Sequence, residues 1–199
     1  MLRHRPERIV APMTVQTPQH LGRHVPANGI DIHYVEAGQG EPLLLLDNAM
    51  VSTNPIWASL PFAYASFLGT LAEHFRVIAP DTRGSGQSVH SGGPIPSGLL
   101  ADDVVALIEA LDLDQPLICG FSDGGETATL AGIRHPGSVR AITVPTLILT
   151  GDRDPFCTVE EGAAACRALQ AGQLAVMPDT GHLITPAAVQ TTIEFFERL

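Results

Sequence analysis

Basic residues are scarce in this sequence, and their scarcity excludes several classes of partner. Its 199 residues contain 11 Lys and Arg against 21 Asp and Glu, which gives a formal net charge of −10. Proteins that bind DNA, RNA or anionic membranes depend on clustered Lys and Arg, and the basic residues here form no long block. The sequence therefore predicts neither a nucleic-acid partner nor a membrane partner.

Long apolar runs and metal-binding cysteine patterns are absent as well. No run reaches the ~18 apolar residues that a membrane-spanning helix needs. No apolar segment follows the arginines near the N-terminus, as it would in a secretory signal. The three cysteines are odd in number and lack metal-ligand spacing. We therefore expect a cytoplasmic protein with three free thiols and no bound metal.

The composition is that of a globular protein with a real core. Hydrophobic residues make up 45% of the chain and charged residues 16%, and there is no internal repeat or low-complexity tract. A chain of this length suits one domain. We expect residues 1–24 to form an N-terminal arm and residues 25–199 to form a single folded domain.

Short apolar runs alternate with helical patterns along the chain. Asn28-Gly29 favours a hairpin turn. The runs that predict strands are residues 30–35, 43–46, 75–79, 117–119, 146–150 and 173–177. The helical patterns cover residues 100–111 with Ser97 as a candidate cap, residues 126–133, and a C-terminal helix with Pro186 at its first position.

This order of elements predicts an α/β fold. We expect a mostly parallel central sheet with helices on both faces and an antiparallel hairpin at its N-terminal end. In such sheets, ligands bind at the carboxyl ends of the strands.

The segment Gly120-Phe121-Ser122-Asp123-Gly124 has the form G-x-S-x-G and stands between a predicted strand and a predicted helix. In that context a tight turn exposes the serine hydroxyl at the end of the sheet. The N-terminus of the following helix favours negative charge that develops nearby. Ser122 is therefore the candidate nucleophile.

A serine nucleophile needs a base, and the base needs a carboxylate that orients it. His182 follows the last predicted strand, and Asp154 follows the strand before it, in the order serine, acid, histidine. We choose Asp154 as the acid and keep Asp152 as the alternative for the same role. Since no metal cluster or phosphate-binding loop is present, the sequence implies no cofactor.

Four motifs in this order resemble those of the α/β-hydrolase superfamily, from about residue 30 to residue 199. They are G-F-S-D-G-G at 120–125, D-T-R-G-S-G-Q-S at 81–88, V-P-T-L-I-L-T-G-D-R-D-P at 144–155, and G-H at 181–182. The resemblance implies that residues 25–199 are a catalytic domain that cleaves small carboxylic esters through an acyl-enzyme. It implies that the backbone N–H groups of Asp123 and Ala49 form the oxyanion hole, and that Arg83 is structural.

The segment around Ser122, residues 120–125, forms the nucleophile elbow of this family. It is also similar to the elbow of amino-acid-ester hydrolases, in which the residue after the serine receives a substrate ammonium group. That resemblance makes Asp123 a candidate substrate-binding residue. Asp47 is a second candidate, since it stands where the family usually has His-Gly, close to the expected oxyanion hole. A carboxylate there opposes an oxyanion, unless the substrate brings its own cation.

A second departure from the family is the missing lid. Residues 134–140 run almost directly into residues 141–145, so no lid domain fits, and the strand that usually precedes the lid is shortened or merged. If that strand is lost, the acid-bearing strand has to lie next to the nucleophile strand. Apolar surface left without a lid favours a homo-oligomer.

Two other kinds of function stay open. One is a non-catalytic binding protein that keeps the fold, and the other is a different reaction of the same fold, such as perhydrolysis or C–C bond hydrolysis. An aspartate nucleophile is disfavoured because Ser122 holds the elbow position. The expected partner is a small-molecule ester.

Overall fold

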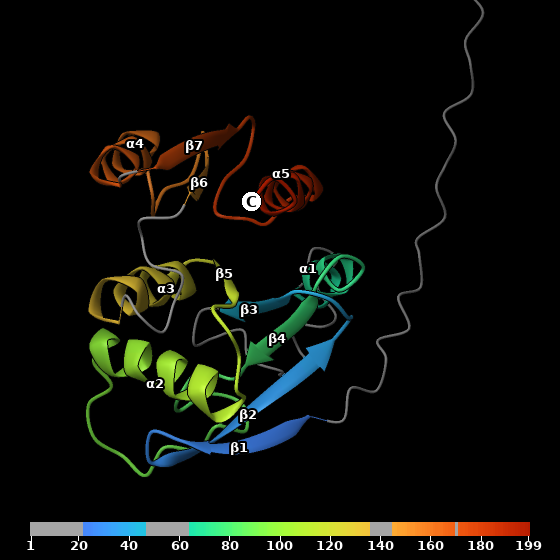
Figure 1. Ribbon diagram of the computed structural model, residues 1–199. Coiled ribbons are helices and arrows are strands. Elements are labelled where there is room, and N and C mark those ends of the chain that lie inside the picture. The colour runs from blue at the N-terminus through green and yellow to red at the C-terminus, as the bar shows by residue number, and fades with distance from the viewer. Residues whose placement is uncertain (1–21, 47–63, 136–144, 170) are drawn as a thin grey trace, which may run out of the picture.

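The described part of the chain begins with a hairpin. The computed structural model describes residues 22–46, 64–135, 145–169 and 171–199 (Figure 1). Strands β1 (Arg23–Ala27) and β2 (Ile30–Ala37) pair antiparallel. Asn28 and Gly29 connect them with φ values of 43° and 76°, which confirms the predicted turn. Arg23 and His24, which the sequence places in the arm, belong to β1.

The first sheet has five strands in the order β1-β2-β4-β3-β5. Strand β3 (Pro42–Leu46) lies between β4 (Arg76–Pro80) and β5 (Leu117–Gly120) and runs parallel to both. Its leucines alternate between two cores: Leu44 and Leu46 face one, and Leu43 and Leu45 face the other. The continuous apolar run at 43–46 is therefore explained by burial on both faces.

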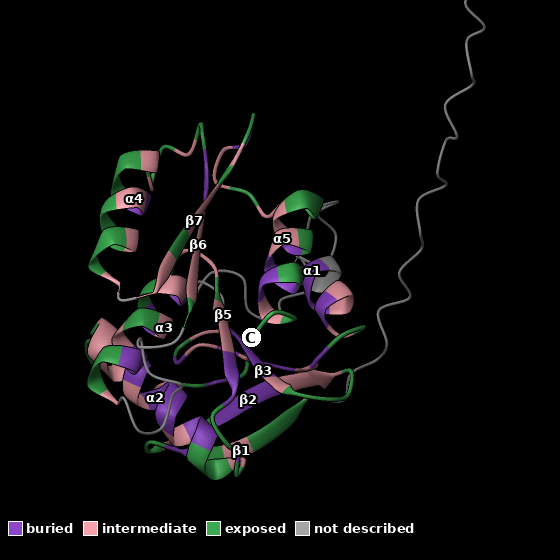
Figure 2. Cartoon of the chain, turned by 45° about the horizontal axis from the view of Figure 1, so that its top comes forward, coloured by how far each residue is buried: buried purple, intermediate pink, exposed green. Residues whose placement is uncertain are grey.

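Helices cover both faces of this sheet, as the sequence predicts. Helices α2 (Ser97–Ala110) and α3 (Asp123–Arg134) pack on the first core. Helices α1 (Tyr64–Leu71) and α5 (Pro186–Phe196) pack on the second. The buried residues gather on β2, β3 and the side of α2 that faces them (Figure 2).

The two predicted helix starts have different outcomes. Pro186 is the first residue of α5, where its missing N–H costs nothing, and Thr185 caps the helix by accepting a hydrogen bond from the Ala188 N–H at 3.2 Å. Ser97 is wrong as a cap because it lies inside α2, and the capping position belongs to Pro96, which makes no side-chain cap.

A second, two-stranded parallel sheet carries the C-terminal part of the fold. Strands β6 (Thr146–Gly151) and β7 (Gly172–Met177) pair along their whole length, and α4 (Val159–Ala168) packs against both. In the part of the chain that the structure describes, β6 does not pair with β5. The described residues therefore do not show the neighbouring position of the acid-bearing and nucleophile strands that a lost strand would require.

The position of β6 is set by its other neighbours. Helix α5 contacts both β6 and α1, so it links the small sheet to the second core. Residues 135–145 connect α3 to β6, and residues 136–144 of this connection lie outside the described residues.

The loops that follow β3, β5, β6 and β7 carry the candidate site. Leu46 and Gly120 are register partners, so β3 and β5 end at the same level of the sheet. Gly151 and Met177 are partners at the ends of β6 and β7. No helix in the described ranges is long and apolar enough to cross a membrane.

Candidate active site

Ser122 lies at a strained turn between β5 and α3. Its φ of 55° and ψ of −123° are unusual for a residue with a side chain. Hydrogen bonds hold this conformation: the Phe121 N–H donates to the Leu46 carbonyl at 3.0 Å, and the Gly124 N–H donates to the Phe121 carbonyl at 2.9 Å. The turn presents the Ser122 hydroxyl at the carboxyl end of the sheet, as the motif predicts.

Glycine is required at Gly120 because the start of α3 comes very close to the end of β5. A Cβ atom at this position would overlap the carbonyl oxygen of Gly124. Gly124 is itself buried at this contact. The glycines of the motif therefore permit the close approach of helix and strand that sets the direction of Ser122.

Three side chains from three loops form a hydrogen-bonded chain. His182 Nδ1 lies 2.8 Å from Asp154 Oδ2, and His182 Nε2 lies 3.1 Å from Ser122 Oγ. The imidazole is 25% exposed and the carboxylate 7% exposed. Because a carboxylate only accepts, Nδ1 carries a proton toward Asp154, and Nε2 is left to accept the serine proton.

Asp154 is held as an anion by its surroundings. Its Oδ1 accepts hydrogen bonds from the N–H groups of Phe156 at 2.8 Å and Cys157 at 3.1 Å, which leaves Oδ2 for His182. Burial acts to raise the pKa of Asp154, but the hydrogen bonds from His182 and the two N–H groups outweigh it, so the pKa lies below its ordinary value.

Asp152, the alternative acid, has a different task. Its Oδ1 accepts the Thr180 N–H at 3.0 Å, and this hydrogen bond is the main cause that lowers the Asp152 pKa. Gly151 allows the loop that contains Thr180 to pass close to the end of β6, because a Cβ atom at this position would overlap the Thr180 carbonyl oxygen. Asp152 and Gly151 thus place the loop that carries His182, and Asp154 alone of the two aspartates contacts the imidazole.

The expected oxyanion hole is described only in part. Asp123 is the first residue of α3, and its N–H has no backbone partner among the described residues. This donor lies next to Ser122 at the positive end of a helix, where an anion is stabilised. The Asp123 side chain is exposed to solvent. Ala49 and Asp47 lie outside the described residues.

Arg83 has the structural role that the resemblance implies. Its Nε donates to Asp103 Oδ2 at 2.7 Å and its Nη2 to Asp103 Oδ1 at 2.6 Å, while Nη2 also reaches the Asn28 carbonyl at 2.7 Å. The two charged side chains are 6% and 9% exposed. This buried ion pair joins the loop after β4 to α2 and to the hairpin turn.

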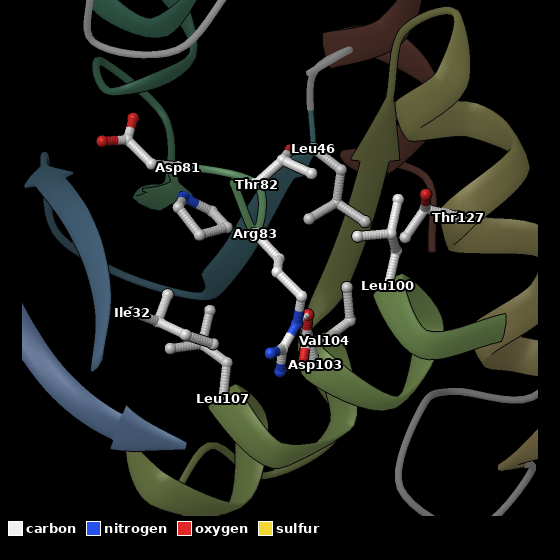
Figure 3. A pocket seen from close by; sticks show the side chains of 11 residues that line it. Ile32, Leu46, Asp81, Thr82, Arg83, Leu100, Asp103, Val104, Leu107 and Thr127 are labelled. Carbon is white, nitrogen blue, oxygen red and sulfur yellow. Dashed lines mark hydrogen bonds and ion pairs between the residues drawn. The ribbon is translucent and has the colours of Figure 1, made fainter. Parts of the chain in front are cut away.

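The ion pair also borders a pocket on the α2 side of the sheet. The pocket encloses about 410 Å³ of space, part of it open to solvent, and side chains from Leu46 and Thr127 form its opposite wall (Figure 3). Among the described residues that line it, none belongs to the hydrogen-bonded chain of Ser122, His182 and Asp154. We therefore assign it no part in the chemistry.

The rest of the D-T-R-G-S-G-Q-S loop is also structural. Asp81 is buried and lies 2.8 Å from His33 Nδ1, and it accepts the Gln87 N–H at 2.8 Å. Ser88 Oγ accepts the His33 N–H at 2.9 Å. These bonds tie the loop to β2 rather than to Ser122.

The cysteines of the described residues do not compete with Ser122 as nucleophiles. Cys119, on β5, is partly buried against the second core, and burial raises the pKa of its thiol to about 12. The thiol is therefore protonated at neutral pH. Cys157 and Cys166, like Cys119, are free thiols that form no disulfide. The described residues contain no cluster of His, Cys, Asp or Glu that would hold a metal ion.

Two aromatic contacts of His182 are missing from the sequence-based account. The Phe121 ring lies 5.0 Å from the imidazole between centroids, tilted by 34°, and the Phe156 ring lies 5.0 Å away at 69°. Both residues stand beside a predicted site residue, Phe121 before Ser122 and Phe156 two residues after Asp154. That proximity in sequence is the only signal that points to them.

Comparisons with known proteins place the chain among proteins of one fold. Residues 56–144 match the family model described as "alpha/beta hydrolase fold". A soluble epoxide hydrolase of Corynebacterium sp. (strain C12) is 33% identical over 133 residues, which are 65% of this chain and 44% of that protein. A serine hydrolase of Mus musculus is 32% identical over 124 residues, 60% of this chain and 40% of that protein.

Among solved structures, a serine hydrolase involved in carbazole degradation superposes with a TM-score of 0.78 at 18% identity. The superposition covers 90% of this chain and 100% of that one, and it shows the shared fold. The chain matches less than half the length of the two curated relatives, and their names describe different kinds of hydrolase. The reaction of this chain therefore has to be argued from its own site.

Proposed function

Because the chain is a member of the α/β-hydrolase superfamily, we propose that it is a serine hydrolase that cleaves small carboxylic esters through an acyl-enzyme. One observation carries the proposal: the continuous hydrogen-bonded chain from Asp154 through His182 to the strained Ser122. A non-catalytic protein of this fold has no need to hold a serine hydroxyl 3.1 Å from an oriented imidazole.

The proposed reaction has two halves. Ser122 Oγ attacks the ester carbonyl carbon while His182 Nε2 takes the hydroxyl proton, and an oxyanion forms. The N–H of Asp123 donates to this oxyanion at the start of α3. The carbon–oxygen bond to the alcohol then breaks, and the alcohol leaves with the proton from Nε2. Water attacks the acyl-enzyme by the same route in reverse, which releases the acid and restores Ser122.

The acidic residues beside the nucleophile bear on the acyl part of the substrate. The exposed carboxylate of Asp123 adjoins Ser122, so it is the proposed contact for an ammonium group carried by the substrate. The same role for Asp47 stays a prediction, because that residue lies outside the described residues.

The test is hydrolysis of p-nitrophenyl acetate by the purified chain and by Ser122→Ala. The variant removes one oxygen atom, so we expect an intact fold and a loss of kcat/KM of at least about 10³-fold. Ser91→Ala is the matched control, since Ser91 is an exposed loop serine. It should hydrolyse the ester like the parent. Full activity of Ser122→Ala, or a folded parent without turnover, would contradict the proposal.

A further inference from the structure

Two exposed apolar side chains lie next to the site residues Asp154 and His182. Phe156 is 77% exposed, the highest value for a large apolar side chain in the described part of the chain. Leu183, the residue after His182, is 63% exposed. Neither side chain belongs to either core, so packing of the fold does not account for them.

The Phe156 ring is nevertheless tied to the chemistry. Its centroid lies 5.0 Å from that of the His182 imidazole, at an angle of 69°. The backbone N–H of Phe156 donates to Asp154 Oδ1 at 2.8 Å. The Cys157 carbonyl next to it accepts the Thr150 hydroxyl at 2.8 Å. Main-chain bonds therefore hold an exposed ring beside the imidazole that moves the proton.

The departing alcohol has to approach the same place. Its oxygen receives the proton from His182 Nε2, so it must come within about 2.6–3.2 Å of that nitrogen. A substituent on that oxygen that lies along the imidazole comes within reach of the Phe156 ring, whose centroid is 5.0 Å from that of His182. Contact between an apolar substituent and the ring removes both surfaces from water, and two aromatic rings gain a further attraction.

We propose that Phe156 binds the alcohol part of the ester and gives the site a preference for apolar, aromatic alcohols such as benzyl alcohol. The assignment rests on the proposed function, because it requires that the departing alcohol takes its proton from His182. It goes beyond that function by naming the half of the substrate that the exposed ring recognises.

Two isomeric esters separate the alcohol side from the acyl side. Benzyl acetate has its aromatic ring on the alcohol, and methyl phenylacetate has the same ring on the acyl group. Phe156→Ala should lower kcat/KM for benzyl acetate by about 2- to 10-fold, the range that an aromatic contact supports. It should leave methyl phenylacetate nearly unchanged. Phe156→Leu, which keeps an apolar side chain, should retain part of the activity toward benzyl acetate.

The matched control is Ile133→Ala on α3, because Ile133 is an exposed apolar residue, at 63%, outside the site. It should not change the ratio of the two esters. Both Phe156 variants keep the N–H that holds Asp154, and a thermal melt of each checks the fold.

Two results would overturn the assignment. An equal loss for both esters means that Phe156 acts by orienting His182, and no loss for either means that the ring does not contact substrate. The proposed function is judged separately with p-nitrophenyl acetate. If the parent cleaves that ester and Phe156→Ala keeps the ratio of the two isomers, only the assignment of Phe156 fails. A parent that cleaves none of the three esters refutes both.

Discussion

Replacing Asp154 by asparagine exchanges one carboxylate oxygen for an NH₂ group. The hydrogen-bond donors around this side chain determine the orientation of the new amide. Two backbone N–H groups, from Phe156 and Cys157, point at Oδ1 at 2.8 and 3.1 Å, while Oδ2 faces His182 Nδ1 at 2.8 Å. An amide has one acceptor oxygen and one NH₂ donor. If the NH₂ faced the two backbone donors, three donors would meet with no acceptor, so the oxygen must take that side.

The amide NH₂ then faces His182 and donates to Nδ1. The imidazole proton has to move to Nε2, and Nε2 can no longer accept the proton of Ser122. Loss of the required tautomer in a triad of this kind costs about 10⁴-fold in kcat, which corresponds to about 5.4 kcal/mol of transition-state stabilisation. The fold should be almost unaffected, since the backbone hydrogen bonds at Oδ1 are kept.

The assay is the initial rate of p-nitrophenyl acetate hydrolysis at neutral pH, with circular dichroism to verify the fold. Asp152→Asn is the matched control, because Asp152 binds the Thr180 N–H and not the imidazole. We expect a much smaller loss for the control. An Asp154→Asn variant that stays within tenfold of the parent would refute the assignment of the acid.

Two further predictions concern how the site is supported. Arg83→Met removes the positive charge that faces the buried Asp103 carboxylate and leaves it only the hydrogen bond from the Asn28 amide. This should cost about 3–5 kcal/mol and lower Tm by about 2–4 °C per kcal/mol, whereas Arg83→Met with Asp103→Leu should recover most of the loss. Differential scanning calorimetry measures both, and equal Tm values for the single and double variants would count against the buried pair. Gly151→Ala should displace the loop that carries His182 and lower kcat. Gly69→Ala should not, because no described residue outside its own helix lies within 4 Å of the added methyl group, and equal kcat for both glycine variants would contradict this account of Gly151.

Much of the site could be predicted because its residues follow strands. The motif around Ser122 combines a tight turn with glycines that permit close packing, and this requirement is visible in the sequence. Asp154 follows β6 and His182 follows β7, and the carboxyl ends of these two strands lie close to Ser122 although the strands form a separate sheet. The choice between Asp152 and Asp154 could not be made with the same force, because both aspartates stand in one loop and only side-chain direction separates them.

Other features depend on packing that no local pattern reveals. Strands β5 and β6 belong to separate sheets and α5 contacts β6, and such long-range arrangements have no signal in the sequence of β5 or β6. The cap of α2 was misjudged since Ser97 and Pro96 both suit a helix start, and the chain uses the extended conformation of Pro96. The rings of Phe121 and Phe156 meet His182 only after three loops are brought together.

The central claim is that Ser122 is an activated nucleophile, and reaction with a fluorophosphonate probe tests it most directly. The serine oxygen attacks phosphorus and fluoride leaves, so each active site gains one stable adduct that mass spectrometry can locate. The account predicts a single adduct on the peptide that contains Ser122, with labelling strongly slowed in His182→Ala. A folded protein that remains unlabelled, or one labelled at another residue, would contradict it.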